Sequence, residues 1–83
     1  MLAIKVLGSG CENCKRLAWL TERAAGHLGI EAQIEKVTDY ARIIEYPILS
    51  TPGLVINEKL VASGRVPSEA EITTFLTNAL SEA

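Results

Sequence analysis

Residues 8–14 read Gly-Ser-Gly-Cys-Glu-Asn-Cys, and this short stretch separates two segments with different hydrophobic patterns. Residues 2–7 before it (Leu-Ala-Ile-Lys-Val-Leu) are mostly apolar and predict a short buried strand that the glycines end. After it, small and apolar residues recur at helical spacing as far as Gly29, which suits the position just past a helix end. These residues are Cys14, Leu17, Ala18, Thr21, Ala25 and Leu28. The two cysteines therefore lie where a strand gives way to a helix.

The middle of the chain predicts a second strand and a short helix. Residues 30–37 alternate loosely between apolar and polar side chains, as a half-buried strand does. Thr38 or Asp39 can cap a short helix, because both side chains accept hydrogen bonds from the first helical N–H groups. This helix is expected to run through Tyr46 and to stop at Pro47.

The last third of the chain predicts a hairpin followed by a helix. Residues 53–56 and 59–63 form two apolar segments, and residues 57–58 (Asn-Glu) can make the tight turn between them because Asn tolerates positive φ. Ser68 lies three residues before Glu71, which is the spacing of a capping box at a helix start. An apolar stripe with the helical period follows: Ile72, Phe75, Leu76, Ala79 and Leu80.

The order of these elements, βαβαββα, predicts a single α/β domain over residues 1–83. The first β-α-β unit implies a parallel pair of strands, and the hairpin adds antiparallel strands. We therefore expect a four-stranded mixed sheet flanked by three helices. A chain of 83 residues has room for one modest core.

Composition narrows the class of protein. The hydrophobic share of 48% and the charged share of 22% are those of an ordinary globular domain. A net charge of −2 without a basic stripe argues against a nucleic-acid partner. The apolar runs are far shorter than the ~20 residues of a membrane span, so no membrane partner is expected. The first residues lack the basic start and cleavage site of a signal peptide, which predicts a cytoplasmic protein.

The position of the cysteine pair points to redox chemistry. Cys11 and Cys14 are the two cysteines of the chain, and a bridge between them closes too short a loop to restrain much chain entropy. At a helix start, unpaired N–H groups and the positive end of the helix dipole stabilise a thiolate. Lys15 and Arg16 add positive charge nearby, whereas Glu12 opposes it. A bridge here would therefore serve chemistry more than stability.

The two cysteines are expected to have different roles. Cys11 precedes the helix and would be the exposed sulfur that attacks a substrate disulfide. Cys14 lies one turn into the helix on its core-facing stripe, and it would release the mixed disulfide by intramolecular exchange. The catalytic residues predicted from position are thus Cys11 and Cys14.

A second feature is the Thr51-Pro52 dipeptide at the mouth of an apolar strand. Proline cannot donate to a strand ladder, so Pro52 belongs at a strand start. Only X–Pro bonds adopt the cis form at low cost, which makes Thr51-Pro52 the natural candidate for a cis bond.

Together, the Cys-x-x-Cys after the first strand and the Thr-Pro before a hairpin resemble the thioredoxin superfamily. The length and residues 51–61 (Thr-Pro-Gly-Leu-Val-Ile-Asn-Glu-Lys-Leu-Val) are similar to its short, glutaredoxin-sized members from bacteria and archaea. The resemblance implies a thioredoxin-like fold, with a cis Pro52 packed beside the cysteines. It also implies that the backbone of Thr51 pairs with an extended substrate segment. Thr51 and Pro52 are accordingly the expected substrate-binding residues.

The resulting hypothesis is a thiol–disulfide oxidoreductase that acts on protein or small-molecule disulfides. The reducing poise of the cytoplasm favours the direction of reduction. The expected partners are a disulfide-containing substrate and an upstream thiol–disulfide reductase, and we expect a monomer without cofactor or resident metal. Two other functions stay open. One is a carrier of soft metal ions that uses both thiolates, and the other is a non-catalytic adaptor that docks partners at Thr51-Pro52.

The sequence also predicts whether the large aromatic side chains outside these motifs are packed or exposed. Trp19 lies off the core-facing stripe of the first helix, so it either packs under the last helix, which we favour, or marks an exposed partner surface. Tyr40 and Tyr46 are expected to be packing residues.

Overall fold

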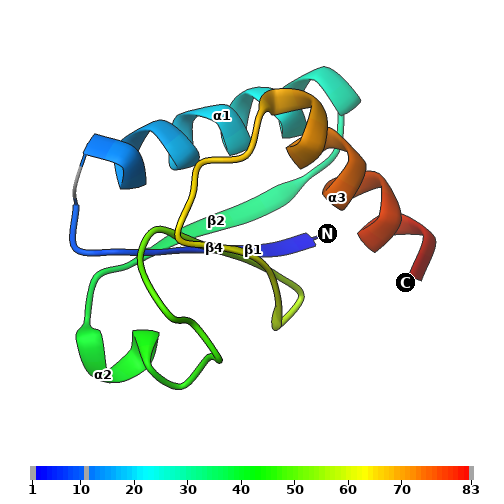
Figure 1. The fold of residues 1–83 in the computed structure, drawn as a ribbon. Coiled ribbons are helices and arrows are strands. Elements are labelled where there is room, and N and C mark those ends of the chain that lie inside the picture. The colour runs from blue at the N-terminus through cyan, green and yellow to red at the C-terminus, as the bar shows by residue number, and fades with distance from the viewer. Residues whose placement is uncertain (1, 11, 83) are drawn as a thin grey trace.

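The computed structural model describes residues 2–10 and 12–82, and within these residues it contains the predicted order of elements (Figure 1). The fold class predicted from the sequence, a four-stranded mixed sheet with three helices, is confirmed. The elements are β1 (Leu2–Leu7), α1 (Glu12–Leu28), β2 (Ala32–Val37), α2 (Tyr40–Ile43), β3 (Gly53–Ile56), β4 (Lys59–Ser63) and α3 (Glu69–Glu82).

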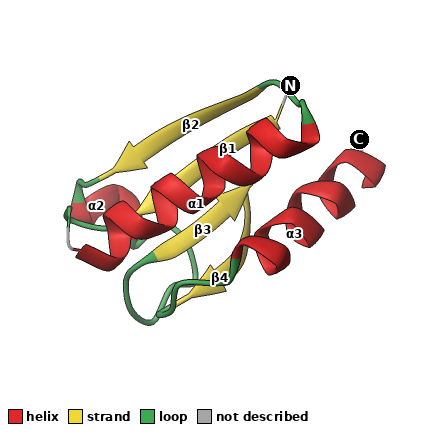
Figure 2. Ribbon diagram, turned by 90° about the horizontal axis from the view of Figure 1, so that it is seen from above, coloured by secondary structure: helices red, strands yellow, loops and turns green. Residues whose placement is uncertain are grey.

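The sheet has the strand order β2-β1-β3-β4. Strands β1 and β2 are parallel, with Leu2 opposite Ala32 and Leu7 opposite Val37. Strand β3 runs antiparallel to both β1 and β4, and the ladder between β3 and β4 is irregular after Leu54. Helices α1 and α3 lie side by side on one face of the sheet, whereas α2 lies beyond the other face (Figures 1 and 2).

The core is divided by the sheet into two clusters. On the side of α1 and α3, the larger cluster includes the fully buried Leu17, Leu54, Ile72 and Leu76. On the other side, the smaller cluster comprises Leu7, Val37, Ile43 and Val55. Burying each such side chain contributes about 1.5–3 kcal/mol, so both layers hold the strands in register.

The ends of the two long helices are fixed by the residues that the sequence predicts. Gly29 has a φ of 66° after α1, and its N–H donates to the carbonyl of Gly26 while that of Ile30 donates to Ala25. This pair of bonds is a Schellman motif. Before α3, the N–H of Glu71 donates to Ser68 Oγ at 3.2 Å, and the N–H of Ser68 donates to Glu71 Oε1 at 3.3 Å. The predicted capping box is confirmed.

The hairpin turn also forms as predicted. Asn57 and Glu58 both have positive φ, 50° and 67°, which is the conformation of a type I′ turn. The Oδ1 of Asn57 accepts a hydrogen bond from the N–H of Ala3 at 3.0 Å, so the turn is tied to the start of β1.

Two predicted boundaries are wrong. Strand β2 begins at Ala32 rather than at residue 30, because the N–H of Ile30 is used in the Schellman motif. Helix α2, which Asp39 caps, ends at Ile43 rather than at Tyr46. The N–H groups of Glu45 and Tyr46 donate to carbonyls three residues back, so the chain leaves the helix in tight turns. A proline disfavours helical geometry in the residue before it, and Pro47 therefore favours this early end.

Three side chains expected to pack are exposed. Trp19 is 55% exposed and has the Arg23 guanidinium 5.0 Å from its ring, so packing under α3 is wrong. Tyr40 is 74% exposed, and Leu80, the last residue of the predicted apolar stripe of α3, is 43% exposed. Tyr46 is half-buried and packs against the smaller cluster, as predicted. None of the helices described is long and apolar enough to cross a membrane.

Candidate functional site

Cys14 lies in the first turn of α1 with its side chain turned toward the sheet and only 5% exposed. Its neighbour is Gly8, which follows β1 directly and whose N–H donates to the carbonyl of Val37 at 3.0 Å. A Cβ on Gly8 would overlap Cys14 Sγ and would lie 3.2 Å from Cys14 Cβ. The sulfur therefore occupies the space that a side chain at position 8 would fill.

Thr51 approaches the same point. Its Cβ lies 3.8 Å from where a Cβ of Gly8 would be, so Cys14 and Thr51 both come within 4 Å of one position. The Thr51–Pro52 peptide bond is cis, and Pro52 is buried. Of the four predicted site residues, the structure thus brings Cys14 and Thr51 together, and Pro52 directly follows Thr51. The fourth, Cys11, lies outside the described residues.

The loop that carries Thr51 is held by its neighbours. The carbonyl of Pro52 accepts a hydrogen bond from the N–H of Gly64 at 2.8 Å. The carbonyl of Ser50 accepts one from Ser63 Oγ at 3.4 Å. By contrast, the N–H and C=O of Thr51 make no hydrogen bond to any residue in 2–10 or 12–82. An exposed, immobilised residue with unused backbone groups is suited to pair with an extended segment of another chain.

Two lysines line a small cavity beside the Cys14 sulfur. The cavity has a volume of about 30 Å³, and Lys15 of α1 and Lys36 of β2 contribute to its wall. Lys15 is expected near the site from the sequence, whereas Lys36 is not. The register of the sheet supplies the reason, because Lys36 pairs with Val6 and shares the face that α1 covers.

Three charged or polar side chains form a separate cluster on the other face of the sheet. Lys5 Nζ donates to Tyr46 Oη at 3.1 Å and to Glu58 Oε1, and Tyr46 Oη lies 3.2 Å from Glu58 Oε2. The hydrogen bond from Lys5 to Glu58 lowers the pKa of Glu58 and raises the pKa of Lys5. The cluster ties β1 and the hairpin turn to the segment that leads to Thr51.

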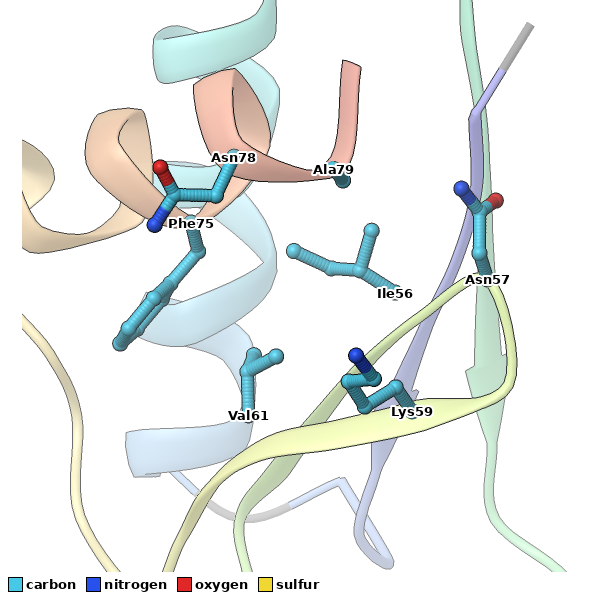
Figure 3. Close-up of a pocket in the computed structure, with 7 residues that line it drawn as sticks. All are labelled: Ile56, Asn57, Lys59, Val61, Phe75, Asn78 and Ala79. Atoms are coloured by element: carbon cyan, nitrogen blue, oxygen red, sulfur yellow. The ribbon is translucent and has the colours of Figure 1, made fainter. Parts of the chain in front are cut away.

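A larger cavity lies away from the candidate site. It has a volume of about 150 Å³ and is formed by the β3–β4 hairpin and α3, with Ile56, Val61 and Phe75 on its apolar walls (Figure 3). Ile56 ends β3, whereas the candidate site adjoins Gly53 at the start of that strand. Among the described residues, no three His, Cys, Asp or Glu side chains converge as metal ligands.

A four-stranded mixed sheet, with a cysteine at a helix start facing a cis Thr-Pro loop, defines the thioredoxin-like class of α/β proteins. Comparison with known families agrees, because the model of the thioredoxin domain matches residues 2–77. The chain therefore belongs to the thioredoxin domain family, as its motifs predict.

Two archaeal relatives support this assignment over most of the chain. A protein named thioredoxin from Methanothermobacter thermautotrophicus is 37% identical over 76 residues, which cover 92% of this chain and 99% of the relative. A protein named thioredoxin from Methanocaldococcus jannaschii is 38% identical over 72 residues, which cover 87% of this chain and 83% of the relative.

Proposed function

We propose that the protein is a thiol–disulfide oxidoreductase that reduces disulfides with the Cys11/Cys14 pair. The observation that carries the proposal is the convergence of Cys14 and Thr51 at Gly8. It puts a sulfur next to the exposed loop residue whose backbone can bind a substrate. The two archaeal relatives named thioredoxin support the same class of reaction.

The proposed reaction has two exchange steps. The Cys11 thiolate attacks one sulfur of the substrate disulfide, so a mixed disulfide forms and the first substrate thiolate leaves. The Cys14 thiolate then attacks the Cys11 sulfur and expels the second substrate thiolate. Two electrons pass to the substrate, and the protein is left with a Cys11–Cys14 disulfide. An upstream thiol–disulfide reductase returns the pair to the dithiol form.

The surroundings of Cys14 support its part in the second step. With 5% of its surface exposed, Cys14 is poorly accessible to a disulfide in solution. It can react with a sulfur that the first step has already brought to the site. Lys15 and Lys36 line the cavity beside Cys14, and the N-terminal end of α1 lies there too, so positive charge is close to the sulfur that makes this attack.

Trapping the mixed disulfide tests the proposal. With a peptide disulfide as substrate, Cys14→Ser should accumulate a covalent adduct, because the second step is blocked. Cys11→Ser should form no adduct and should not reduce the peptide. Ser9→Ala, an exposed change in the same loop, serves as the control and should turn over like the wild type.

Two outcomes would contradict the proposal. An adduct on Cys11→Ser instead of Cys14→Ser would reverse the roles of the thiols. Thiols that react with an alkylating reagent only after a chelator is added would favour the metal carrier.

A further inference from the structure

Two lysines beside the candidate site lack the ion-pair partners that other basic side chains of this protein have. The structure pairs lysines and arginines with glutamates at several places: Lys5, Arg23, Arg42 and Arg65. By contrast, Lys15 and Lys36 form no ion pair with any residue in 2–10 or 12–82. Their positive charges are therefore left for a group that comes from outside this part of the chain.

Lys15 and Lys36 line the same cavity beside Cys14, although they belong to α1 and β2. No acidic side chain of the described residues lines this cavity, and the hydroxyl of Thr38 supplies a further hydrogen-bond donor at its wall. Two ammonium groups at one cavity repel each other, so an anion bound between them lowers the free energy of the arrangement. The cavity is thus suited to a negatively charged group.

The acidic residues nearby in the sequence do not fill this role. Glu35, which precedes Lys36, is held by Arg42 at 2.7 Å, and Asp39 caps α2. Glu12 is exposed in the first turn of α1 and does not line the cavity. The whole chain has a net charge of −2, so the cavity is a local exception in an acidic protein. A cleft lined by charges of one sign raises the local concentration of oppositely charged molecules.

We propose that Lys15 and Lys36 bind a carboxylate of a polypeptide substrate close to the cysteine that Cys11 attacks. The proposal rests on the proposed function and names its substrate class, an acidic polypeptide disulfide. Gly8 connects the two parts of the site, because it lines the cavity and also has Thr51 close to it. An extended segment advances about 3.3 Å per residue, so a substrate bound at Thr51 brings its neighbouring side chains to the cavity.

The size of the cavity favours a polypeptide over a small disulfide such as glutathione disulfide. Its volume of about 30 Å³ admits a group of a few atoms, such as one carboxylate. Sites that enclose a whole small molecule have roughly 300–1,000 Å³. The cavity therefore recognises one acidic side chain of a segment whose remaining contacts are made elsewhere on the surface.

Three peptide disulfides that differ only in charge test the proposal. They share one sequence except at the residues two before and two after the cysteine, which are Glu, Gln or Lys. With dithiothreitol as the reductant, the wild type should reduce the Glu peptide with a kcat/KM up to about fivefold above that of the Gln peptide, which is the most that an exposed charge pair usually supplies. The Lys peptide should react more slowly than the Gln peptide. Added NaCl should bring the ratio of Glu to Gln peptide toward one, because salt screens exposed charges.

Substitutions at the two lysines identify the groups responsible. Lys15→Gln and Lys36→Gln should each bring the ratio of Glu to Gln peptide toward one, mainly through KM, and Lys36→Arg should keep the ratio above one. Lys59→Gln is the control, because it removes the same charge from the start of β4, where Lys59 pairs with Ile56 at the far end of β3 from the candidate site. This variant should keep the wild-type ratio.

The outcomes separate this proposal from the proposed function. If the wild type reduces all three peptides equally well, the lysines do not select substrates and this proposal is overturned, while the redox function stands. A uniform loss of rate in Lys15→Gln and Lys36→Gln, with the ratio unchanged, would also overturn it, because the charges would then act on the Cys14 sulfur alone. Faster reduction of glutathione disulfide than of the Glu peptide would overturn the choice of a polypeptide. If the wild type reduces none of these disulfides, the redox function fails and this proposal fails with it.

Discussion

Replacing Gly8 by alanine adds one methyl group at the point where the candidate site is most tightly packed. The new Cβ would overlap Cys14 Sγ and lie 3.2 Å from Cys14 Cβ, with Thr51 Cβ at 3.8 Å. Overpacking of this kind typically costs about 1–3 kcal/mol. Alanine also restricts the unfolded chain more than glycine does, which stabilises the folded state by about 0.4–1 kcal/mol. Gly8→Ala should therefore lower the free energy of unfolding by about 1.3 kcal/mol at the middle of these ranges, and by at most about 2.6 kcal/mol.

Gly8→Ala should also slow the second exchange step, in which Cys14 attacks the mixed disulfide. Gly8 is fixed by its bond to Val37, so the Cys14 sulfur is the group that must move. A displaced sulfur is misaligned for attack on the Cys11 mixed disulfide, and that adduct should accumulate during turnover. Urea unfolding gives the change in stability, and rapid acid quenching followed by mass measurement gives the adduct.

Gly26→Ala is a matched control for this experiment. It makes the same chemical change within α1, and a Cβ there would meet no atom within 4 Å. Alanine in a helix is favoured over glycine, so this variant should be stabilised by about 0.5–1 kcal/mol. If Gly8→Ala is as stable as Gly26→Ala and resolves the adduct at the wild-type rate, Cys14 does not pack against Gly8 and the site geometry is wrong.

Two further changes test interactions away from the site. Ser68→Ala removes the capping box and should cost about 0.5–2 kcal/mol in urea unfolding without slowing peptide reduction; an unchanged midpoint would show that the cap does not stabilise α3. Lys5 lowers the pKa of Glu58, so the stabilisation by this carboxylate is present above its usual pKa of 4.5 and is lost as the pH falls below it. The stability difference between the wild type and Glu58→Gln should therefore shrink as the pH is lowered from 7 through 4.5; a constant difference would contradict the linkage.

Elements with strong local signals can be predicted from this sequence alone. The bounds of β1, β3 and β4 agree with the prediction, because glycines and a turn dipeptide end each apolar segment. The capping box and Gly29 likewise mark helix ends through local hydrogen bonds. Helix α2 is less predictable, because Asp39 and Pro47 bracket a segment that is only partly helical.

The site is predictable in its parts but not in its assembly. Cys14 and Thr51 stand out through their motifs, yet Gly8 does not, because its role is to leave room for a sulfur that follows it in the chain. Lys36 looks like an ordinary surface lysine until the register with Val6 puts it beside α1. Leu49 and Tyr40 are apolar, and their exposure depends on a loop whose path no periodic pattern specifies.

The order of the strands also determines where copies of this chain could pair edge to edge. Strands β2 and β4 form the two edges of the sheet, and open edges invite uncontrolled strand pairing and aggregation. The edge strand β2 carries Glu35, which is paired with Arg42 at 2.7 Å, and β4 starts with Lys59 and meets β3 through an irregular ladder. Charges and irregularities of this kind discourage a further strand from joining the sheet. Strand addition is thus discouraged along both long edges, and under the proposed function the substrate backbone is recognised instead at the short loop that carries Thr51.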